Sequence, residues 1–189
     1  MAAELFKILD AYAAFETAVR RQIAELCAPH CSVCERVCCQ PQFCRENVDS
    51  PFLTLLSAKT LATAAYSAHR GWLTSKGCAL SAGRPPVCYQ FSCNQILNAQ
   101  PDDQHRFRLR VLSNLVPHIG KRALGGRHLV EIMDPAQLEK VRFKRFARRL
   151  GEARRALQVI RSSQSQGLAA PAAREILLKI IPIPRSLAG

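Results

Sequence analysis

Nine cysteines in two separate groups constrain this 189-residue chain more than any other feature. Six of them lie between positions 27 and 44, and three more lie between positions 78 and 93. Burial as small apolar side chains accounts for one or two cysteines, but not for six so close together. Short spacings let several thiolates converge on one centre at little cost in loop entropy. The pattern therefore predicts a thiolate metal site.

The N-terminal region indicates the compartment in which these thiols work. Glu4, Lys7 and Asp10 interrupt the first apolar stretch, so it has no apolar core of the length that a secretory signal needs. No stretch reaches the roughly 20 apolar residues of a membrane span. We therefore expect a cytoplasmic protein without membrane contact. Cytosolic thiols stay reduced, and clustered cysteines there bind metal more often than they form disulfides.

All nine cysteines are candidate metal ligands, and those of the first group have helical spacing. Four of them follow one another at steps of four, three and four residues, which places them on one face of a helix. Pro29 can begin a new helical turn there and need not break the helix. The predicted ligands are Cys27, Cys31, Cys34, Cys38, Cys39, Cys44, Cys78, Cys88 and Cys93.

The order of the motifs carries a resemblance to a known family. A first block with Cys31-x2-Cys34 and Cys38-Cys39 precedes a second block with Cys78-x-Leu80, Arg84-Pro85, Cys88 and Phe91. Over roughly residues 27–93 the chain thus resembles the YkgJ-like cysteine-cluster family, whose members are described as zinc- or iron-chelating. Tyr89 stands where that family usually has arginine. The resemblance implies metal chelation through these cysteines, and related domains occur within lysine N-methylases that act on flagellin.

The cofactor and its surroundings have more than one interpretation. Zinc takes four ligands in a tetrahedron, whereas an iron–sulfur cluster takes about four thiolates, often a tight run plus a remote cysteine. Nine cysteines suffice for either metal, in one centre or two. A thiolate cage is anionic, so Arg84 is a candidate cofactor-binding residue that offsets its charge. The alternative for Arg84 is a role in capping its loop.

The rest of the sequence predicts a mainly α fold. Apolar residues recur at three- and four-residue steps, and cap-plus-proline pairs precede two of the predicted helices. The predicted helices cover 4–26, 51–71, 101–116, 134–161 and 171–181, with a short extended piece at 128–133. We expect a small helical domain with a loop-based metal site between helices and a long basic helix. The predicted units are a cysteine-cluster module (1–94), a basic helical extension packed on it (95–165), and a linker with a short helix (166–189).

Positive charge concentrates in the second half of the chain. Residues 1–94 hold nine Lys/Arg against seven Asp/Glu, and residues 95–189 hold eighteen against seven, for a total of +13. Nine cations fall within 140–161, opposed only by Glu152. Such a helix favours an acidic protein partner or nucleic acid bound without sequence preference, unless it is simply a solvated face.

The main functional prediction is a metal-binding protein that chelates zinc or iron, including iron in an iron–sulfur cluster, through thiolates from both blocks. One alternative is an iron–sulfur-dependent enzyme, either methyltransferase-like or redox-active. Another is a nucleic-acid-binding protein with a structural metal. An enzyme needs an open coordination position or a substrate pocket next to the metal, whereas a closed site with four cysteines favours structure or storage. No catalytic residue is assigned.

Overall fold

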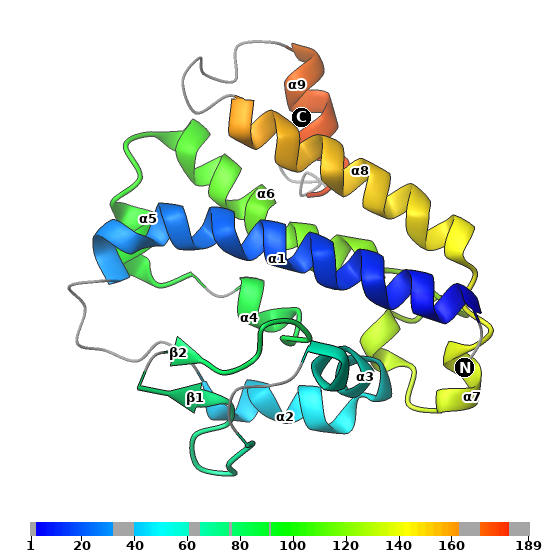
Figure 1. Ribbon diagram of the computed structural model, residues 1–189. Helices are drawn as coiled ribbons and strands as arrows, with labels where there is room; N and C mark the ends of the chain where they lie inside the picture. The colour runs from blue at the N-terminus through cyan, green and yellow to red at the C-terminus, as the bar shows by residue number, and fades with distance from the viewer. Residues whose placement is uncertain are drawn as a thin grey trace.

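The computed structural model describes residues 3–31, 40–60, 65–75, 77–90, 92–162 and 171–181. Over these residues the fold is mainly α, as the sequence predicts, with a single two-stranded antiparallel hairpin (Figure 1). The elements in chain order are α1 (Ala3–Cys31), α2 (Pro41–Asp49), α3 (Pro51–Thr60), β1 (Leu73–Thr74), β2 (Gly77–Cys78), α4 (Val87–Gln90), α5 (Asn94–Asn98), α6 (Asp103–Gly120), the 3-10 helix η1 (Leu129–Glu131), α7 (Pro135–Leu138), α8 (Phe143–Ser162) and α9 (Pro171–Leu178).

Three long helices, α1, α6 and α8, contact one another and form the main bundle (Figure 1). Each has an apolar stripe at helical spacing that faces the other two. The stripe of α1 runs from Leu5 through Tyr12 to Val19, and that of α8 runs from Phe146 to Ile160. All of these side chains are buried. The burial of these stripes is the main force that holds the bundle together.

A second layer lies on the other side of α1 and contains α2, α3 and the hairpin (Figure 1). Its central contact is an edge-to-face pair between Tyr12 and Phe52, whose ring centroids are 5.1 Å apart. The segment between the hairpin and α4 returns to α1, so the second cysteine block lies against the bundle. One contiguous apolar core joins residues from both halves of the chain.

Several boundaries differ from the sequence prediction. Helix α1 continues through Pro29 to Cys31, beyond the predicted end at residue 26. The helix predicted over 134–161 begins at Pro135 as expected, but it is interrupted after Leu138 and resumes at Phe143. The segment predicted as extended, 128–133, contains a 3-10 turn because His128 and Glu131 form a reciprocal capping box. None of the described helices is long and apolar enough to cross a membrane.

Candidate functional site

A buried carboxylate on α1 holds the second cysteine block in place. Glu16 is fully buried, and its oxygens accept hydrogen bonds from the backbone N–H groups of Gly83 (2.8 Å) and Arg84 (2.9 Å). The hydroxyl of Tyr89 donates a third, at 2.5 Å. Burial raises the pKa of Glu16, whereas the three donors and nearby Arg20 oppose that shift. Three donors on one carboxylate fix the segment from Gly83 to Tyr89 against α1.

Two further contacts hold the 81–83 segment, one from α2 and one from α1. The Asn47 amide donates to the Gly83 carbonyl at 2.6 Å, and Arg20 donates to the Ser81 carbonyl. Gly83 has a φ of +82°, and a Cβ at this position would lie 2.9 Å from the Leu53 carbonyl oxygen. Glycine is therefore needed both for the backbone conformation and for the close approach of α3.

Cysteines of the two blocks meet at the end of α1. Cys27 and Cys31 lie one turn apart on α1, and their thiols are hydrogen-bonded. Cys93, just before α5, is close enough to affect the ionisation of Cys27. Helices α1 and α5 are in contact at this point (Figure 1). Cys27 therefore has one neighbouring thiol from its own block, Cys31, and one from the second block, Cys93.

The thiol of Cys27 is protonated at neutral pH. Partial burial, the Cys31 and Cys93 thiols, and the hydrogen bond with Cys31 together raise its pKa to about 11. A thiol with a raised pKa is a poor nucleophile, because the thiolate is the reactive form. This environment disfavours covalent catalysis by Cys27, whereas a bound cation would favour its thiolate.

The other described cysteines lie on α2, β2 and α4. Cys44 is on α2, where its sulfur packs so closely against Gly71 that a Cβ there would lie 2.4 Å from it. Cys78 is on β2 and influences the ionisation of Arg20, and Cys88 is exposed on α4. The remaining predicted ligands, Cys34, Cys38 and Cys39, lie outside the described residues. Within the described ranges, no group of three or more Cys, His, Asp or Glu side chains is close enough to hold a metal ion.

A pocket of about 500 Å³ lies beside Cys88, and we call it the cysteine-side pocket. Its polar lining comes from Thr17, Arg20, Arg21, Ser81, Arg84 and Cys88. Burial and then the Arg84 guanidinium lower the pKa of Arg20, whereas Tyr89, Glu16 and Cys78 oppose that shift. The predicted cofactor-binding residue Arg84 thus faces this pocket, and its Nε donates to the Leu80 carbonyl at 3.3 Å.

The cysteine motifs do not indicate the three residues whose side chains hold the second block in place, which are Glu16, Arg20 and Asn47. A signal for Glu16 is nevertheless present, because it lies four residues after Tyr12, within the apolar stripe of α1. A carboxylate in such a stripe must find buried donors. The chain's second block supplies them 67 to 73 residues later.

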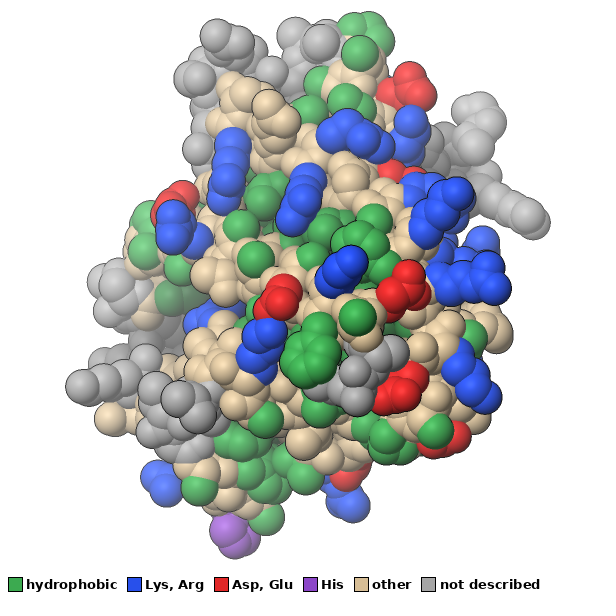
Figure 2. Space-filling model, turned by 45° about the vertical axis from the view of Figure 1, so that its right-hand side comes forward, with side chains coloured by type: hydrophobic (Ala, Val, Ile, Leu, Met, Phe, Trp, Pro, Cys, Tyr) green, Lys and Arg blue, Asp and Glu red, His purple; other side chains and the backbone are tan. Residues whose placement is uncertain are grey.

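The cations predicted to form a basic face lie mostly on the outer side of α8. Lys144, Arg145, Arg148, Arg154 and Arg155 are exposed. Figure 2 shows Lys and Arg side chains spread over one face of the molecule, with acidic side chains between them in places.

Comparison with protein-family models, with curated proteins and with solved structures finds no match for this chain.

Proposed function

We propose that this chain is a metal-binding cysteine-cluster protein that chelates zinc or iron, including iron in an iron–sulfur cluster, through thiolates from both blocks. The observation that supports this most directly is that Cys93 lies close enough to Cys27 to raise its pKa. Cys27 belongs to the first block and Cys93 to the second, so local sequence alone does not bring them together. The resemblance to the YkgJ-like family points to the same chemistry.

The neighbourhood has the donor chemistry that such a centre needs. Thiolates are the ligands of structural zinc and of iron–sulfur clusters. Cys27 and Cys31 would supply two of them from α1, and Cys93 a third. Cys34, Cys38 and Cys39 follow directly in the chain and would complete the set. Arg20 and Arg84 would offset the negative charge of the thiolates on the side of the second block.

The first test is the metal content of the full chain after anaerobic purification. We expect a stoichiometric metal, read by elemental analysis together with acid-labile sulfide and the absorption spectrum. Visible absorption with iron and sulfide would identify a cluster, whereas a colourless, zinc-loaded protein would identify a zinc site. Metal-free protein that takes up neither zinc nor iron on reconstitution would overturn the proposal.

A matched pair of variants tests whether the two blocks share the metal. Cys93→Ser removes one thiol of the shared neighbourhood, and Ser92→Ala changes the adjacent side chain without removing a thiol. We expect Cys93→Ser to weaken metal binding by at least about tenfold, and Ser92→Ala to bind as the unaltered chain does. Equal metal binding in the two variants, with helicity retained, would exclude Cys93 as a ligand.

The cysteine-side pocket favours an enzyme as the second candidate function. It opens beside Cys88, which is one of the predicted ligands, and its lining includes three arginines, so an anionic substrate would fit there. In this case the protein would be methyltransferase-like or redox-active. Small anions that bind at Arg21 and change the spectrum of the bound metal would favour the enzyme. A spectrum insensitive to such anions would favour storage or structural support.

The exposed cations of α8 favour a third function, which is the binding of a polyanion without sequence preference. An acidic protein or nucleic acid would be held there by charge alone, and therefore in a strongly salt-dependent way. Replacing Arg148, Arg154 and Arg155 with Gln should lower the salt concentration at which the chain elutes from heparin. Unchanged elution would exclude α8 as a polyanion-binding surface.

A further inference from the structure

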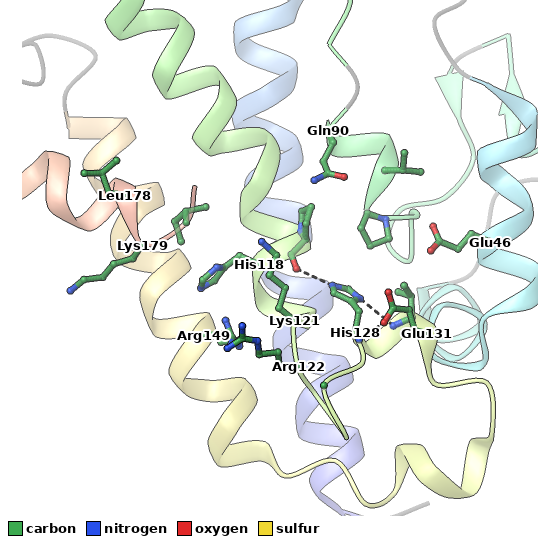
Figure 3. A pocket seen from close by; sticks show the side chains of 16 residues that line it. Glu46, Gln90, His118, Lys121, Arg122, His128, Glu131, Arg149, Leu178 and Lys179 are labelled. Carbon is green, nitrogen blue, oxygen red and sulfur yellow. Dashed lines mark hydrogen bonds between the residues drawn. The ribbon is translucent and has the colours of Figure 1, made fainter. Parts of the chain in front are cut away.

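A second cavity, on the far side of α4 from the cysteine-side pocket, has a different character. It has a volume of about 630 Å³ and lies between the end of α6, α8, η1 and α9 (Figure 3). Its charged lining includes Lys121, Arg122, Arg149, Glu46 and Glu131. We call this cavity the basic cleft. Among the residues that the structure describes, no cysteine lines this cleft.

The cations of the basic cleft lie together at one end. Figure 3 shows the side chains of Lys121, Arg122 and Arg149 gathered near His118, while Glu46 and Glu131 lie at the opposite end. Burial and then the charges of Arg149 and Arg122 lower the pKa of Lys121. Burial likewise lowers the pKa of Arg149, and Arg122 is among the cations that lower it further. These three groups therefore repel one another in the protein without a ligand.

Glu152 of α8 offsets part of this charge at Arg149, where it opposes the lowered pKa, and its Oε2 is also 2.8 Å from Nε2 of buried His118. At Lys121 the charged groups that shift the pKa are both cations, Arg149 and Arg122. The Nε of Arg149 is buried, and it has no hydrogen-bond partner within the part of the chain that the structure describes. A buried guanidinium N–H without an acceptor is costly, and this cost adds to the unfavourable electrostatics of Arg149.

The backbone of the basic cleft is also strained at a cationic residue. Arg122 has a φ of +52°, and it is the one non-glycine residue with positive φ among those described. Its carbonyl accepts a hydrogen bond from Arg145 at 3.4 Å, which ties this turn to α8. Non-glycine residues rarely adopt this conformation, and such strain is concentrated at binding sites. Here it keeps the Arg122 side chain next to Lys121 and Arg149 (Figure 3).

We propose that the basic cleft binds a small phosphorylated compound, with its phosphoryl group held by Lys121, Arg122 and Arg149. Arginine forks and a lysine ammonium are the groups that recognise phosphate oxygens. The other end, with the Glu46 and Glu131 carboxylates, accepts hydrogen bonds, so the rest of the ligand carries hydroxyl or amino groups. The size of the cavity suits a metabolite-sized molecule.

Pyrophosphate is the probe for this site, because it presents phosphoryl oxygens without the rest of the ligand. The full chain is titrated with inorganic pyrophosphate by calorimetry, with sodium chloride used to keep ionic strength constant. We expect saturable binding of one pyrophosphate per chain. Arg149→Gln should weaken it by at least about tenfold, as expected for loss of a charge-assisted hydrogen bond.

Arg154→Gln is the matched control, because Arg154 is an exposed arginine on the same helix that does not line the basic cleft. We expect this variant to bind pyrophosphate within about twofold of the unaltered chain, since an exposed charge acts only through screened attraction. Lys121→Gln is a second cleft variant in case Arg149→Gln does not fold. Equal weakening by Arg154→Gln and the cleft variants, or no binding above the salt control, would overturn the proposal. Competition by an oligonucleotide that depends on Arg154 would instead assign these cations to a nucleic-acid surface.

Discussion

The two cavities on either side of α4 differ in the groups that surround their cations. In the cysteine-side pocket, burial and then Arg84 lower the pKa of Arg20, and Tyr89, Glu16 and Cys78 oppose that shift. In the basic cleft, burial and then two arginines lower the pKa of Lys121, and Glu152 opposes the lowered pKa of Arg149 against three other arginines. The chain's own anionic groups therefore offset less of the positive charge in the basic cleft, which leaves its cations available for a ligand.

The short helix α4 separates these environments. Cys88 and Tyr89 line the cysteine-side pocket, whereas Val87 and Gln90 line the basic cleft. Tyr89 is also the residue through which Glu16 holds α4 on α1. A change in the segment around α4 would therefore reach both cavities. The predictions below test two points. The first is whether the contacts of Glu16 and Gly83 stabilise the cysteine side, and the second is whether the repulsion among cations lowers the stability of the cleft side.

The largest effect is expected at Glu16. In Glu16→Gln an amide N–H₂ group replaces one carboxylate oxygen and faces a backbone N–H of Gly83 or Arg84, so at least one buried donor loses its acceptor. We expect the free energy of unfolding to fall by about 3 kcal/mol. Chemical denaturation measures this loss, and hydrogen exchange should show weaker protection of the 79–90 segment.

Glu25→Gln is the control on the same helix, because Glu25 is exposed and its oxygen accepts from Gln22 at 3.1 Å. The amide oxygen of the variant can still accept that bond. A change of less than about 0.5 kcal/mol is expected. If the two variants lost the same stability, Glu16 would not be the anchor of the second block.

Two glycines with nearly the same positive φ allow the two sides to be compared directly. Gly83 has φ +82° on the cysteine side, and Gly126 has φ +84° in the lining of the basic cleft. A Cβ at 83 would lie 2.9 Å from the Leu53 carbonyl oxygen, whereas nothing lies within 4 Å of one at 126. Both alanine variants incur the cost of positive φ, about 1 kcal/mol, and only Gly83→Ala adds the steric contact.

We therefore expect Gly83→Ala to lower the free energy of unfolding by about 2 kcal/mol and Gly126→Ala by about 1 kcal/mol. Thermal and chemical denaturation of both variants provide the measurement. The difference between the two isolates the packing of α3 on the 79–83 segment. Equal losses would indicate that this packing adapts at no cost.

The sequence predicts the helices better than it predicts their ends. Apolar periodicity identifies α1, α6 and α8, because their stripes are long and regular. The predicted end of the first helix, at residue 26, is five residues too early, because the apolar stripe stops there while the helix continues through Pro29 to Cys31. The 3-10 turn at 129–131 depends on hydrogen bonds between His128 and Glu131, which apolar periodicity does not detect.

In the candidate sites, too, local sequence patterns predict some contacts and not others. Cysteine spacing alone indicates that Cys27 and Cys31 lie together, since they share a helix face. Their proximity to Cys93 depends on how α5 packs on α1. The partners of Glu16 lie 67 or more residues away in the chain, and Lys121, Arg122 and Arg149 converge only when α6 and α8 pack. Spacing rules describe neighbours within one element, so contacts of this kind need the tertiary structure.

The smallest predicted effect is a pH dependence that arises on the cleft side. Burial lowers the pKa of His118; Glu152 opposes the shift, and Arg149 and Lys121 add to it. Burial likewise lowers the pKa of His128, which Glu131 and the Pro117 carbonyl oppose and Lys121 and Arg149 reinforce. Below about pH 6.5 the unfolded chain therefore takes up protons that the folded chain does not. Since the unfolded state binds more protons in this window, stability falls as pH is lowered.

Between pH 7.5 and 5.5 we expect each of these histidines to reduce the free energy of unfolding by up to about 1 kcal/mol. Urea denaturation at several pH values measures the slope of the free energy of unfolding against pH. The variants are compared by this slope, because His118→Gln also changes the stability at neutral pH. His118→Gln should remove about half of the slope that His118 and His128 contribute together. The control is His69→Gln, at an exposed turn position, which should leave the slope unchanged. A flat profile between pH 7.5 and 5.5 would mean that the cleft bears no electrostatic cost. The contrast between the two cavities would then lie in their shape and not in their charge.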